Sequence, residues 1–350
     1  MKAQVLYGIN DLRYEEKFPN PMLKQGNVLV QVKACGICGS DVNRVLNTGA
    51  YFSPAILGHE FAGVVKDVYD MEDEYLIGKK VAVFPLIPCQ QCVSCNLGNY
   101  QLCESYDYIG SRSNGAFSEF VSVPKWNLIE IPDDISFEVA AMLEPMAVAF
   151  HSLRLADNIF GKKIIITGTG TIASMLAQFT IAGGASHVIV IGRDKQKLGF
   201  VKTVAPDISI IDTAEKGFNE CVNEYFGGKA DIIIEATGAS TMIAMAIQLV
   251  DRKGTVVLLG NPADDVKLQK EFFWQILRKE IIIKGSWNSS FGIIGKNDWE
   301  DVLILIKNKK IETNNLVTHR LPLSELMQGI QIMTDKNILS NKVMVVFDEK

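Results

Sequence analysis

Four cysteines within fifteen residues carry the strongest chemical signal in the sequence. They follow the spacing C-x2-C-x2-C-x7-C, at Cys89, Cys92, Cys95 and Cys103. Four thiolates at this spacing suit one tetrahedral Zn²⁺ with no open coordination position. An iron–sulfur cluster needs a shorter last spacing and a proline after the last cysteine, whereas Glu104 follows here; four unrelated buried thiols are the remaining alternative. We expect a structural zinc site in a lobe at about residues 85–105, where metal binding stabilises the fold.

Two glycines follow an apolar run and indicate a dinucleotide site. The sequence Gly168-Thr169-Gly170-Thr171-Ile172-Ala173 reads G-x-G-x-x-A and opens a helical pattern. The first glycine permits a tight turn, and the second lets the backbone approach a pyrophosphate at the helix N-terminus. An ordinary glycine turn is the alternative. We predict that Gly168, Gly170, Thr171 and Ile172 bind the cofactor.

The end of the next strand bears on the choice of cofactor. Chains that bind NAD carry an acidic residue about 20 residues after the glycine motif, where it holds the ribose 2′-hydroxyl. Here Gly192 stands at that position, followed by Arg193 and, on the next helix, Lys197. Arginine can pair with a 2′-phosphate through two parallel hydrogen bonds. This pattern favours NADP; the alternative is NAD, with Asp194 on the 2′-hydroxyl.

Three scattered segments supply ligands for a second metal. They contain Cys38, the pair His59-Glu60, and Glu144 before a proline. A catalytic zinc site needs three protein ligands and one open position, which a cysteine, a histidine and a carboxylate would provide. Taken singly, each of these residues is more often structural.

Alternating strands and helices from about residue 160 position the glycine motif. The expected strands are Lys163–Thr167, Val188–Ile191, Ser209–Asp212, Asp231–Glu235, Thr255–Leu259 and Ile281–Lys284. The expected helices are Ile172–Ala182, Lys195–Val204, Ala214–Phe226, Ser240–Val250 and Leu268–Lys279. This order predicts an α/β fold with a doubly wound parallel sheet of six strands.

The rest of the chain is β-rich at first and mixed at the end. Strands are expected at Asn27–Ala34, Val64–Val68, Lys80–Phe84 and Lys342–Phe347, and helices at Trp299–Lys307 and Leu323–Met333. We therefore expect residues 156–289 to form a nucleotide-binding domain inserted in a catalytic domain of residues 1–155 and 290–350.

Composition limits the partners. The 350 residues carry 35 Lys and Arg against 40 Asp and Glu, a net charge of −5. This balance argues against nucleic acid as a partner. No apolar stretch approaches the length of a membrane span, and no signal peptide is evident. The sequence therefore predicts a cytoplasmic protein with no membrane partner.

Two motifs resemble those of a known family. Gly36-Ile37-Cys38-Gly39-Ser40-Asp41 and Gly58-His59-Glu60-Phe61-Ala62-Gly63 are similar to motifs of the zinc-containing medium-chain dehydrogenases, and the resemblance covers essentially the whole chain. It implies a GroES-like catalytic domain, a Rossmann domain and two Zn²⁺ per subunit. Within the family the chain most resembles the polyol dehydrogenases. The segments Tyr106–Arg112 and Lys284–Asn288 resemble those of enzymes acting on polyol phosphates such as galactitol 1-phosphate.

The resemblance also implies roles for individual residues. Cys38 and His59 correspond to ligands of the catalytic zinc, and Glu60 and Glu144 to carboxylates that bind the metal or hold its water. Which of the two carboxylates binds zinc stays open. Asp41 corresponds to the residue that orients the histidine, and Ser40 to the hydroxyl that relays the alcohol proton. The implied reaction is reversible hydride transfer from a secondary alcohol to NAD(P).

Two further residues bear on substrate recognition, Arg112 and Asn288. We expect Arg112 to bind a substrate phosphate, with a surface or interdomain salt bridge as the alternative. Where sorbitol dehydrogenases carry an arginine for the polyol chain, Asn288 stands here, which makes free sorbitol a poorer candidate. A free polyol or secondary alcohol is the alternative substrate; a non-catalytic nucleotide-binding protein is disfavoured by the full set of site residues. The family forms homodimers and homotetramers, and the strand Ile281–Lys284 could extend a sheet across subunits.

Overall fold

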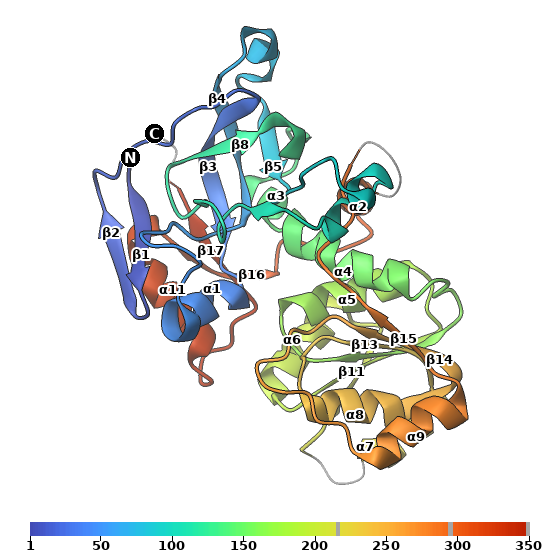
Figure 1. Cartoon of the computed structure of the whole chain (residues 1–350). Coiled ribbons are helices and arrows are strands. Elements are labelled where there is room, and N and C mark those ends of the chain that lie inside the picture. Colours follow the sequence, from blue (N-terminus) through green and yellow to red (C-terminus); the bar gives the residue numbers. More distant parts are fainter. Residues whose placement is uncertain (215–217, 293–296, 348–350) are drawn as a thin grey trace. The chain divides into compact units, whose positions relative to one another are not determined.

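The computed structural model describes residues 1–214, 218–292 and 297–347. Contacts divide the chain into two compact units (Figure 1). The first comprises Met1–Pro145, Phe291–Trp299 and Val317–Lys350, and the second comprises Met146–Ser290 and Glu300–Leu316. Among the described residues, no helix combines the length and the apolar character that crossing a membrane requires.

A six-stranded parallel sheet forms the centre of the second unit. Its strands lie in the order β12-β11-β10-β13-β14-β15, which is 3-2-1-4-5-6 in chain order and confirms the predicted doubly wound fold. The strands are β10 (Lys163–Thr167), β11 (His187–Gly192), β12 (Ser209–Asp212), β13 (Ala230–Glu235), β14 (Val250–Leu258) and β15 (Ile282–Gly285). The connecting helices are α5 (Thr171–Ala182), α6 (Lys195–Val204), α7 (Phe218–Phe226), α8 (Ser240–Leu249) and α9 (Lys270–Lys279).

In the second unit, most expected elements lie within a few residues of their observed bounds, and two differ. We expected a helix to start at Ala214, but α7 begins at Phe218, and residues 215–217 lie outside the described residues. We also assigned Val250 to a helix, whereas it begins β14. The exposed residues after it include Lys253, whose φ of +59° turns the backbone, and the pairing of β13 with β14 shifts register at this point. The apolar pattern of β14 therefore resumes only at Thr255.

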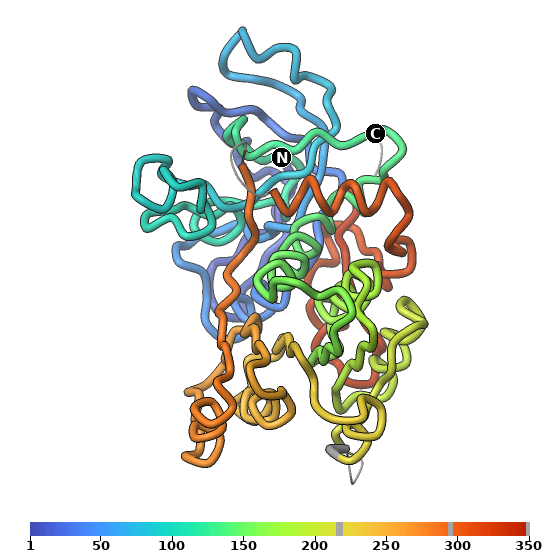
Figure 2. Tube along the Cα trace, turned by 90° about the vertical axis from the view of Figure 1, so that its right-hand side faces the viewer, coloured from blue at the N-terminus to red at the C-terminus, as the bar shows by residue number. Residues whose placement is uncertain are grey.

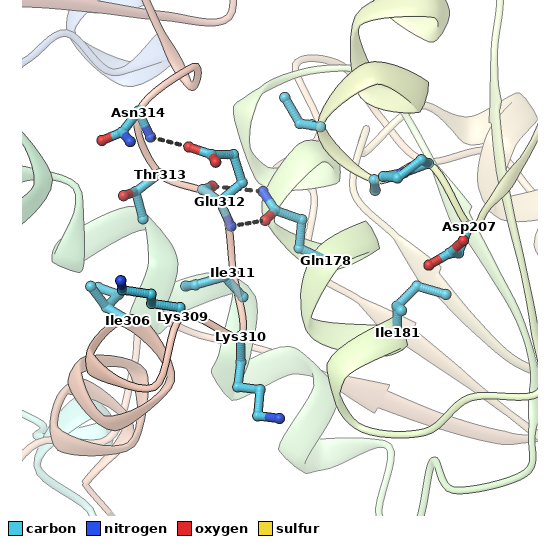
Figure 3. A pocket seen from close by; sticks show the side chains of 13 residues that line it. Gln178, Ile181, Asp207, Ile306, Lys309, Lys310, Ile311, Glu312, Thr313 and Asn314 are labelled. Atoms are coloured by element: carbon cyan, nitrogen blue, oxygen red, sulfur yellow. Dashed lines mark hydrogen bonds between the residues drawn. The ribbon is translucent and has the colours of Figure 1, made fainter.

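Two segments outside 156–289 pack with the second unit. In α4 (Leu143–Leu155), the Phe150 ring lies 5.4 Å from that of Phe179. The Gln178 side chain and the Glu312 backbone form a reciprocal pair: Gln178 Nε2 donates to Glu312 O (3.1 Å), and Glu312 N donates to Gln178 Oε1 (2.6 Å). Figure 3 shows this pair. These contacts explain why residues 146–155 and 300–316, which the sequence analysis placed in the catalytic domain, belong to the second unit.

The pocket in Figure 3 has a volume of about 510 Å³ and lies within the second unit. Its lining includes Gln178 and Ile181 near the C-terminal end of α5, and Val204 at that of α6. The glycine motif precedes the N-terminal end of α5. The pocket is therefore at the opposite end of this helix from the nucleotide motif.

The first unit is built on a mixed sheet with the order β16-β17-β3-β4-β5-β9, where β8 also pairs with β3. The strands are β3 (Asn27–Gly36), β4 (Glu60–Val68), β5 (Lys80–Val83), β8 (Phe120–Pro124), β9 (Leu128–Glu130), β16 (Val317–Leu321) and β17 (Lys342–Val346). Alternating residues of β3 are buried, as expected for a strand with one face on the core. β1 (Ala3–Gly8) and β2 (Asp11–Glu15) form a separate antiparallel pair.

Short helices complete the first unit. They are α1 (Gly39–Asn43), α2 (Val93–Asn96), α3 (Phe137–Ala141) and α11 (Leu326–Thr334); α10 (Asp298–Lys307) begins in this unit and continues into the second. α11 starts later than expected because residues Leu323–Glu325 form a separate 3₁₀ turn. The lobe that contains α2 leaves the sheet as its own loop (Figure 2), next to the short pair β6 (Leu86–Ile87) and β7 (Asp107–Tyr108).

Candidate functional site

The four clustered cysteines meet in the lobe around α2. Their sulfur atoms all lie within 4.8 Å of one another. A Zn–S bond of about 2.3 Å requires sulfurs about 3.8 Å apart in a tetrahedron, so the cluster fits the ion after small adjustments.

Backbone N–H groups stabilise negative charge on this cluster. The N–H of Cys89 donates to Cys103 Sγ at 3.2 Å. Backbone N–H groups of Glu104 and Cys95 lower the pKa of the Cys92 thiol to about 6, whereas burial and neighbouring thiols raise the pKa of Cys95 to about 12. Thiolates held by backbone donors around a common centre suit a structural Zn²⁺.

A second cluster forms where β3 ends and β4 begins. Ligand atoms of Cys38, His59 and Glu60 lie within 4.8 Å of one another. Gly36 pairs with Glu60 in the sheet register, and a Cβ at Gly36 would lie 2.2 Å from Glu60 Oε2. Glycine at this position therefore leaves room for the carboxylate beside the cysteine and the histidine.

Asp41 organises the second cluster from within α1. Its Oδ2 accepts the Cys38 N–H at 3.0 Å, and its Oδ1 lies 3.5 Å from Nδ1 of His59. Burial by itself would lower the pKa of the His59 imidazole, but the charges and hydrogen bonds of Asp41 and Cys38 raise it well above its usual value. Because Nδ1 faces Asp41, Nε2 is the nitrogen left for a metal. This arrangement of carboxylate, histidine and cysteine fits a zinc site.

Glu144 lies near this cluster but is not part of the group within 4.8 Å. Its Oε1 accepts a hydrogen bond from the Tyr108 hydroxyl at 3.3 Å, and the Tyr108 ring meets that of His59 edge-on at 5.8 Å. Burial raises the pKa of Glu144 to about 7; His59 opposes this increase and Glu60 adds to it. Of the two candidate carboxylates, the described structure thus groups Glu60 with Cys38 and His59.

Sequence reasoning missed two residues at this cluster, Lys342 and Tyr108. The Lys342 ammonium contacts Glu60 Oε2 and also donates to Ile37 O at 3.3 Å. Lys342 begins a closing strand otherwise made of apolar residues, and a lysine inside such a strand is a signal for a buried partner. Tyr108 lies in the segment Tyr106–Arg112, which resembles the family but shows no spacing that would connect this tyrosine with the metal ligands.

The glycine motif of the second unit adopts the expected turn. Gly168 has a φ of +104°, and Gly170 is the N-terminal cap of α5. A Cβ on Gly170 would meet no atom within 4 Å. The start of α5, with Thr171 and Ile172, therefore has an open approach of the kind that a pyrophosphate requires.

Side chains at the end of β11 limit the choice of cofactor. A Cβ on Gly192 would lie 2.3 Å from Thr169 Cγ2, so any side chain at this position would require Thr169 to move. Asp194 caps α6 by accepting the N–H groups of Gln196 (3.1 Å) and Lys197 (3.0 Å) on one oxygen. Arg193 is exposed. Asp194, the alternative residue for binding the ribose 2′-hydroxyl, thus already accepts hydrogen bonds from the first turn of α6.

The predicted substrate residues lie in both units. Ser40 is half-buried on α1. Arg112 is exposed, and its guanidinium carbon lies 4.7 Å from the Tyr106 ring centre and 5.1 Å from that of Tyr51. Asn288 belongs to the second unit, where its Oδ1 accepts the Ser289 N–H at 2.9 Å. Arg112 makes no ion pair with any described residue.

A Rossmann sheet and two zinc-ligand clusters in one chain define a zinc-dependent, nucleotide-linked oxidoreductase. Residues 24–133 match the family model for the alcohol dehydrogenase GroES-like domain, and residues 170–308 match that for zinc-binding dehydrogenases. The chain belongs to the zinc-binding alcohol dehydrogenase family. It is a zinc-dependent, NAD(P)-linked alcohol or polyol dehydrogenase, as the sequence predicted.

Curated relatives act on polyols and sugar acids. Galactitol 1-phosphate 5-dehydrogenase of Escherichia coli K12 is 30% identical over 334 residues, covering 92% of this chain and 93% of the relative. L-galactonate-5-dehydrogenase of the same strain is 29% identical over 331 residues, covering 93% and 92%.

Solved structures agree with this assignment. Galactitol-1-phosphate dehydrogenase of E. coli superposes with a TM-score of 0.90 at 29% identity, covering 99% of this chain and 100% of the relative. A zinc-binding dehydrogenase of Sinorhizobium meliloti bound to NADP gives 0.89 at 26%, covering 99% of both chains. An alcohol dehydrogenase of E. coli CFT073 complexed with NADH gives 0.90 at 26%, also covering 99% of both. Both cofactors thus occur among similar structures.

Proposed function

We propose that this enzyme oxidises a secondary alcohol of a polyol phosphate, of the galactitol 1-phosphate type, to a ketose phosphate, and reduces the ketose in reverse. The observation that carries the proposal is the position of Arg112. Its guanidinium stacks on two tyrosine rings and has no acidic partner among the described residues. An exposed cation of this kind suits a phosphate, which arginine binds through parallel hydrogen bonds.

Hydrogen bonds tie the loop that carries Arg112 to the segment that carries His59. The N–H of Ala116 donates to Gly58 O at 2.9 Å, and a Cβ at Gly110 would lie 2.3 Å from the same oxygen. Ring contacts also connect the two: His59 meets Tyr108 at 5.8 Å, and Tyr108 meets Tyr106 at 6.4 Å. The cation is therefore held at a defined place relative to the metal ligands.

Each residue of the site has a separate role in the proposed reaction. When bound, the zinc would supply Lewis acidity that favours the ionised alcohol, and the nicotinamide nucleotide would supply the hydride acceptor. Cys38, His59 and Glu60 hold the metal, and Asp41 orients His59. Ser40 would relay the alcohol proton: its hydroxyl oxygen accepts that proton as its own hydroxyl proton passes outward. Glu144, held by Tyr108, provides a second carboxylate near the ligands that can hold a water molecule.

The cofactor proposed is NADP. Arg193 and Lys197 are placed after Gly192, which carries no side chain that would repel a 2′-phosphate. The capping role of Asp194 favours the same choice, because an oxygen that accepts two backbone N–H groups is less available to a ribose.

We also propose that the enzyme forms a homodimer or homotetramer through the edge of the Rossmann sheet. β15 is an edge strand, and Ile282 and Ile283 are 47% and 40% exposed. The neighbouring α9 buries none of its residues and leaves Trp274 and Leu277 exposed. Apolar surface of this kind on a sheet edge favours pairing with a second copy.

Initial rates of zinc-loaded enzyme test the substrate proposal. We expect turnover of galactitol 1-phosphate with NADP⁺ at a much higher kcat/KM than that of galactitol or sorbitol. Equal kcat/KM for the free polyols would refute the phosphate specificity. Cys38→Ser should abolish turnover while NADP binding persists, and unchanged turnover in that variant would refute the catalytic zinc site.

A further inference from the structure

A second arginine lies close to the proposed substrate residues and was not singled out from the sequence. Arg44 follows α1, and its backbone N–H donates to Ser40 O. Residues four apart on a helical turn share a face. Arg44 is therefore placed one turn from Ser40, on the same side of the chain.

The side chains of Arg44 and Arg112 converge on one aromatic ring. The guanidinium carbon of Arg44 lies 5.8 Å from the Tyr51 ring centre, and that of Arg112 lies 5.1 Å from it. The two cations are thus at most about 11 Å apart, which is the sum of these distances. They come from segments far apart in the sequence, so the fold itself brings them together.

The two guanidinium groups lack an acidic partner in the part of the chain that the structure describes. Within the described residues, no carboxylate forms an ion pair with Arg44 or Arg112, and Nη1 of Arg44 is buried without a hydrogen-bond partner. The chain as a whole has a net charge of −5. The two arginines at the Tyr51 ring therefore form a local positive charge on a protein that is negatively charged overall. A buried donor without a partner is costly, and a bound anion would remove that cost.

The Tyr51 ring is well suited to give way to such an anion. It is 69% exposed, and cation–π contacts at exposed sites are weak. Hydrogen bonds from arginine to a phosphate are stronger than such contacts. The ring can therefore rotate aside while both guanidinium groups turn to one ligand.

We propose that Arg44 and Arg112 together bind the terminal phosphate of the substrate. The Tyr51 ring contacts both guanidinium groups when no substrate is bound. The proposal rests on the proposed function and extends it: Arg44 becomes a specificity residue that selects an anionic end group. A carboxylate at the end of a sugar acid shares part of this chemistry but carries one negative charge. The two arginines favour the phosphate, which is mostly a dianion at neutral pH.

Substrate kinetics and variants test the pair. Galactitol 1-phosphate, galactonate and galactitol are compared for the wild type and for Arg44→Met, Arg112→Met and Arg44→Lys. We expect the ratio of kcat/KM for galactitol 1-phosphate to that for galactitol to fall about 10- to 100-fold in each methionine variant, mainly through KM. Arg44→Lys, which keeps the charge, should restore part of the ratio.

Arg13→Met is the matched control. Arg13 also stacks on a tyrosine, with its guanidinium carbon 4.6 Å from the Tyr7 ring centre, but it is paired with Asp11 at 2.7 Å. This variant should keep the wild-type ratio, since its cation is already neutralised.

The outcomes separate the two proposals. A wild type without preference for the phosphate ester contradicts the proposed function; a preferring wild type whose ratio is unchanged by Arg44→Met contradicts only the role of Arg44. A higher kcat/KM for galactonate assigns the site to carboxylates and overturns the phosphate proposal.

Calorimetric titration with inorganic phosphate gives a readout independent of turnover. We expect wild type and Arg13→Met to bind the ion and both methionine variants at the pair to lose at least tenfold in affinity. No phosphate binding by the wild type counts against the paired site.

Discussion

The Lys342 ammonium contacts the Glu60 carboxylate inside the first unit, and the exposed fractions of the two side chains are only 4% and 2%. The two residues come from β17 and β4, and Lys342 also donates to Ile37 O. Lys342 therefore gives the Glu60 carboxylate a cationic partner in addition to the zinc ion proposed at Cys38, His59 and Glu60. The pair fixes Glu60 in the ligand cluster and balances its charge when no metal is present.

Lys342→Met should destabilise the metal-free protein more than the zinc-loaded protein. Removing one partner of a buried ion pair leaves an uncompensated charge and costs about 3–5 kcal/mol, whereas a bound zinc ion would offset much of this charge. Urea unfolding with EDTA and with zinc measures the difference. Lys79→Met is the control, because its pair with Glu130 is about half exposed on both sides. An equal loss of stability in both states would contradict this role for the lysine.

Glu144 should make the metal-free protein less stable as the pH rises. Burial raises its pKa to about 7 from 4.5, so the folded chain binds this proton more tightly than the unfolded chain does. The shift contributes roughly 3 kcal/mol to the free energy of unfolding, at 1.36 kcal/mol per pKa unit. This contribution is complete below pH 4.5 and is lost as the pH passes about 7. Glu144→Gln should remove this part of the dependence.

Urea unfolding between pH 4.5 and 8 in the presence of EDTA measures this effect. The informative quantity is the difference in slope between wild type and variant, because other groups titrate in both. Glu72→Gln, at a side chain that is 80% exposed, should follow the wild type. A Glu144→Gln variant with the wild-type slope would exclude a raised pKa for this carboxyl group.

Cys103→Ser should remove one of the two zinc ions and leave the other. The four sulfurs share one centre, so losing one thiolate disrupts a closed tetrahedral site. Native mass spectrometry should give one zinc per chain, with a lower Tm. Cys221→Ser changes a cysteine outside both clusters and should keep two. One zinc per chain in the wild type would show that only one cluster binds metal.

The sequence predicted the elements and ligands that depend on local pattern. β10 and β12 were placed at their observed bounds because apolar runs there end in turn residues, and the four-cysteine spacing is itself a local signal. Contacts between distant segments were not predictable in this way. Lys342 and Glu60 are 282 residues apart, and no spacing rule connects them.

If the proposed oligomer forms through the apolar edge, a charge at that edge should convert it to a monomer. A lysine in place of Ile283 would put a charge on the exposed edge strand β15, which opposes pairing of strand edges. Light scattering after size exclusion measures the mass. Ile304→Lys is the control, since Ile304 is 53% exposed on α10 and lies outside this edge. A monomeric wild type would exclude the edge as an interface.

Cofactor preference should depend on the space between Gly192 and Thr169. An aspartate at Gly192 could hold the 2′-hydroxyl of NAD and repel the 2′-phosphate of NADP, but its Cβ would lie 2.3 Å from Thr169 Cγ2. Gly192→Asp alone should therefore weaken binding of both cofactors. The double variant with Thr169→Ser lacks the clashing methyl group and should shift the ratio of kcat/KM for NADP to that for NAD at least tenfold toward NAD. Thr169→Ser alone should keep the wild-type preference, which separates the effect of the carboxylate from that of the added space. A double variant that still prefers NADP would show that Arg193 and Lys197 dominate the choice, and a wild type that prefers NAD would contradict the NADP proposal.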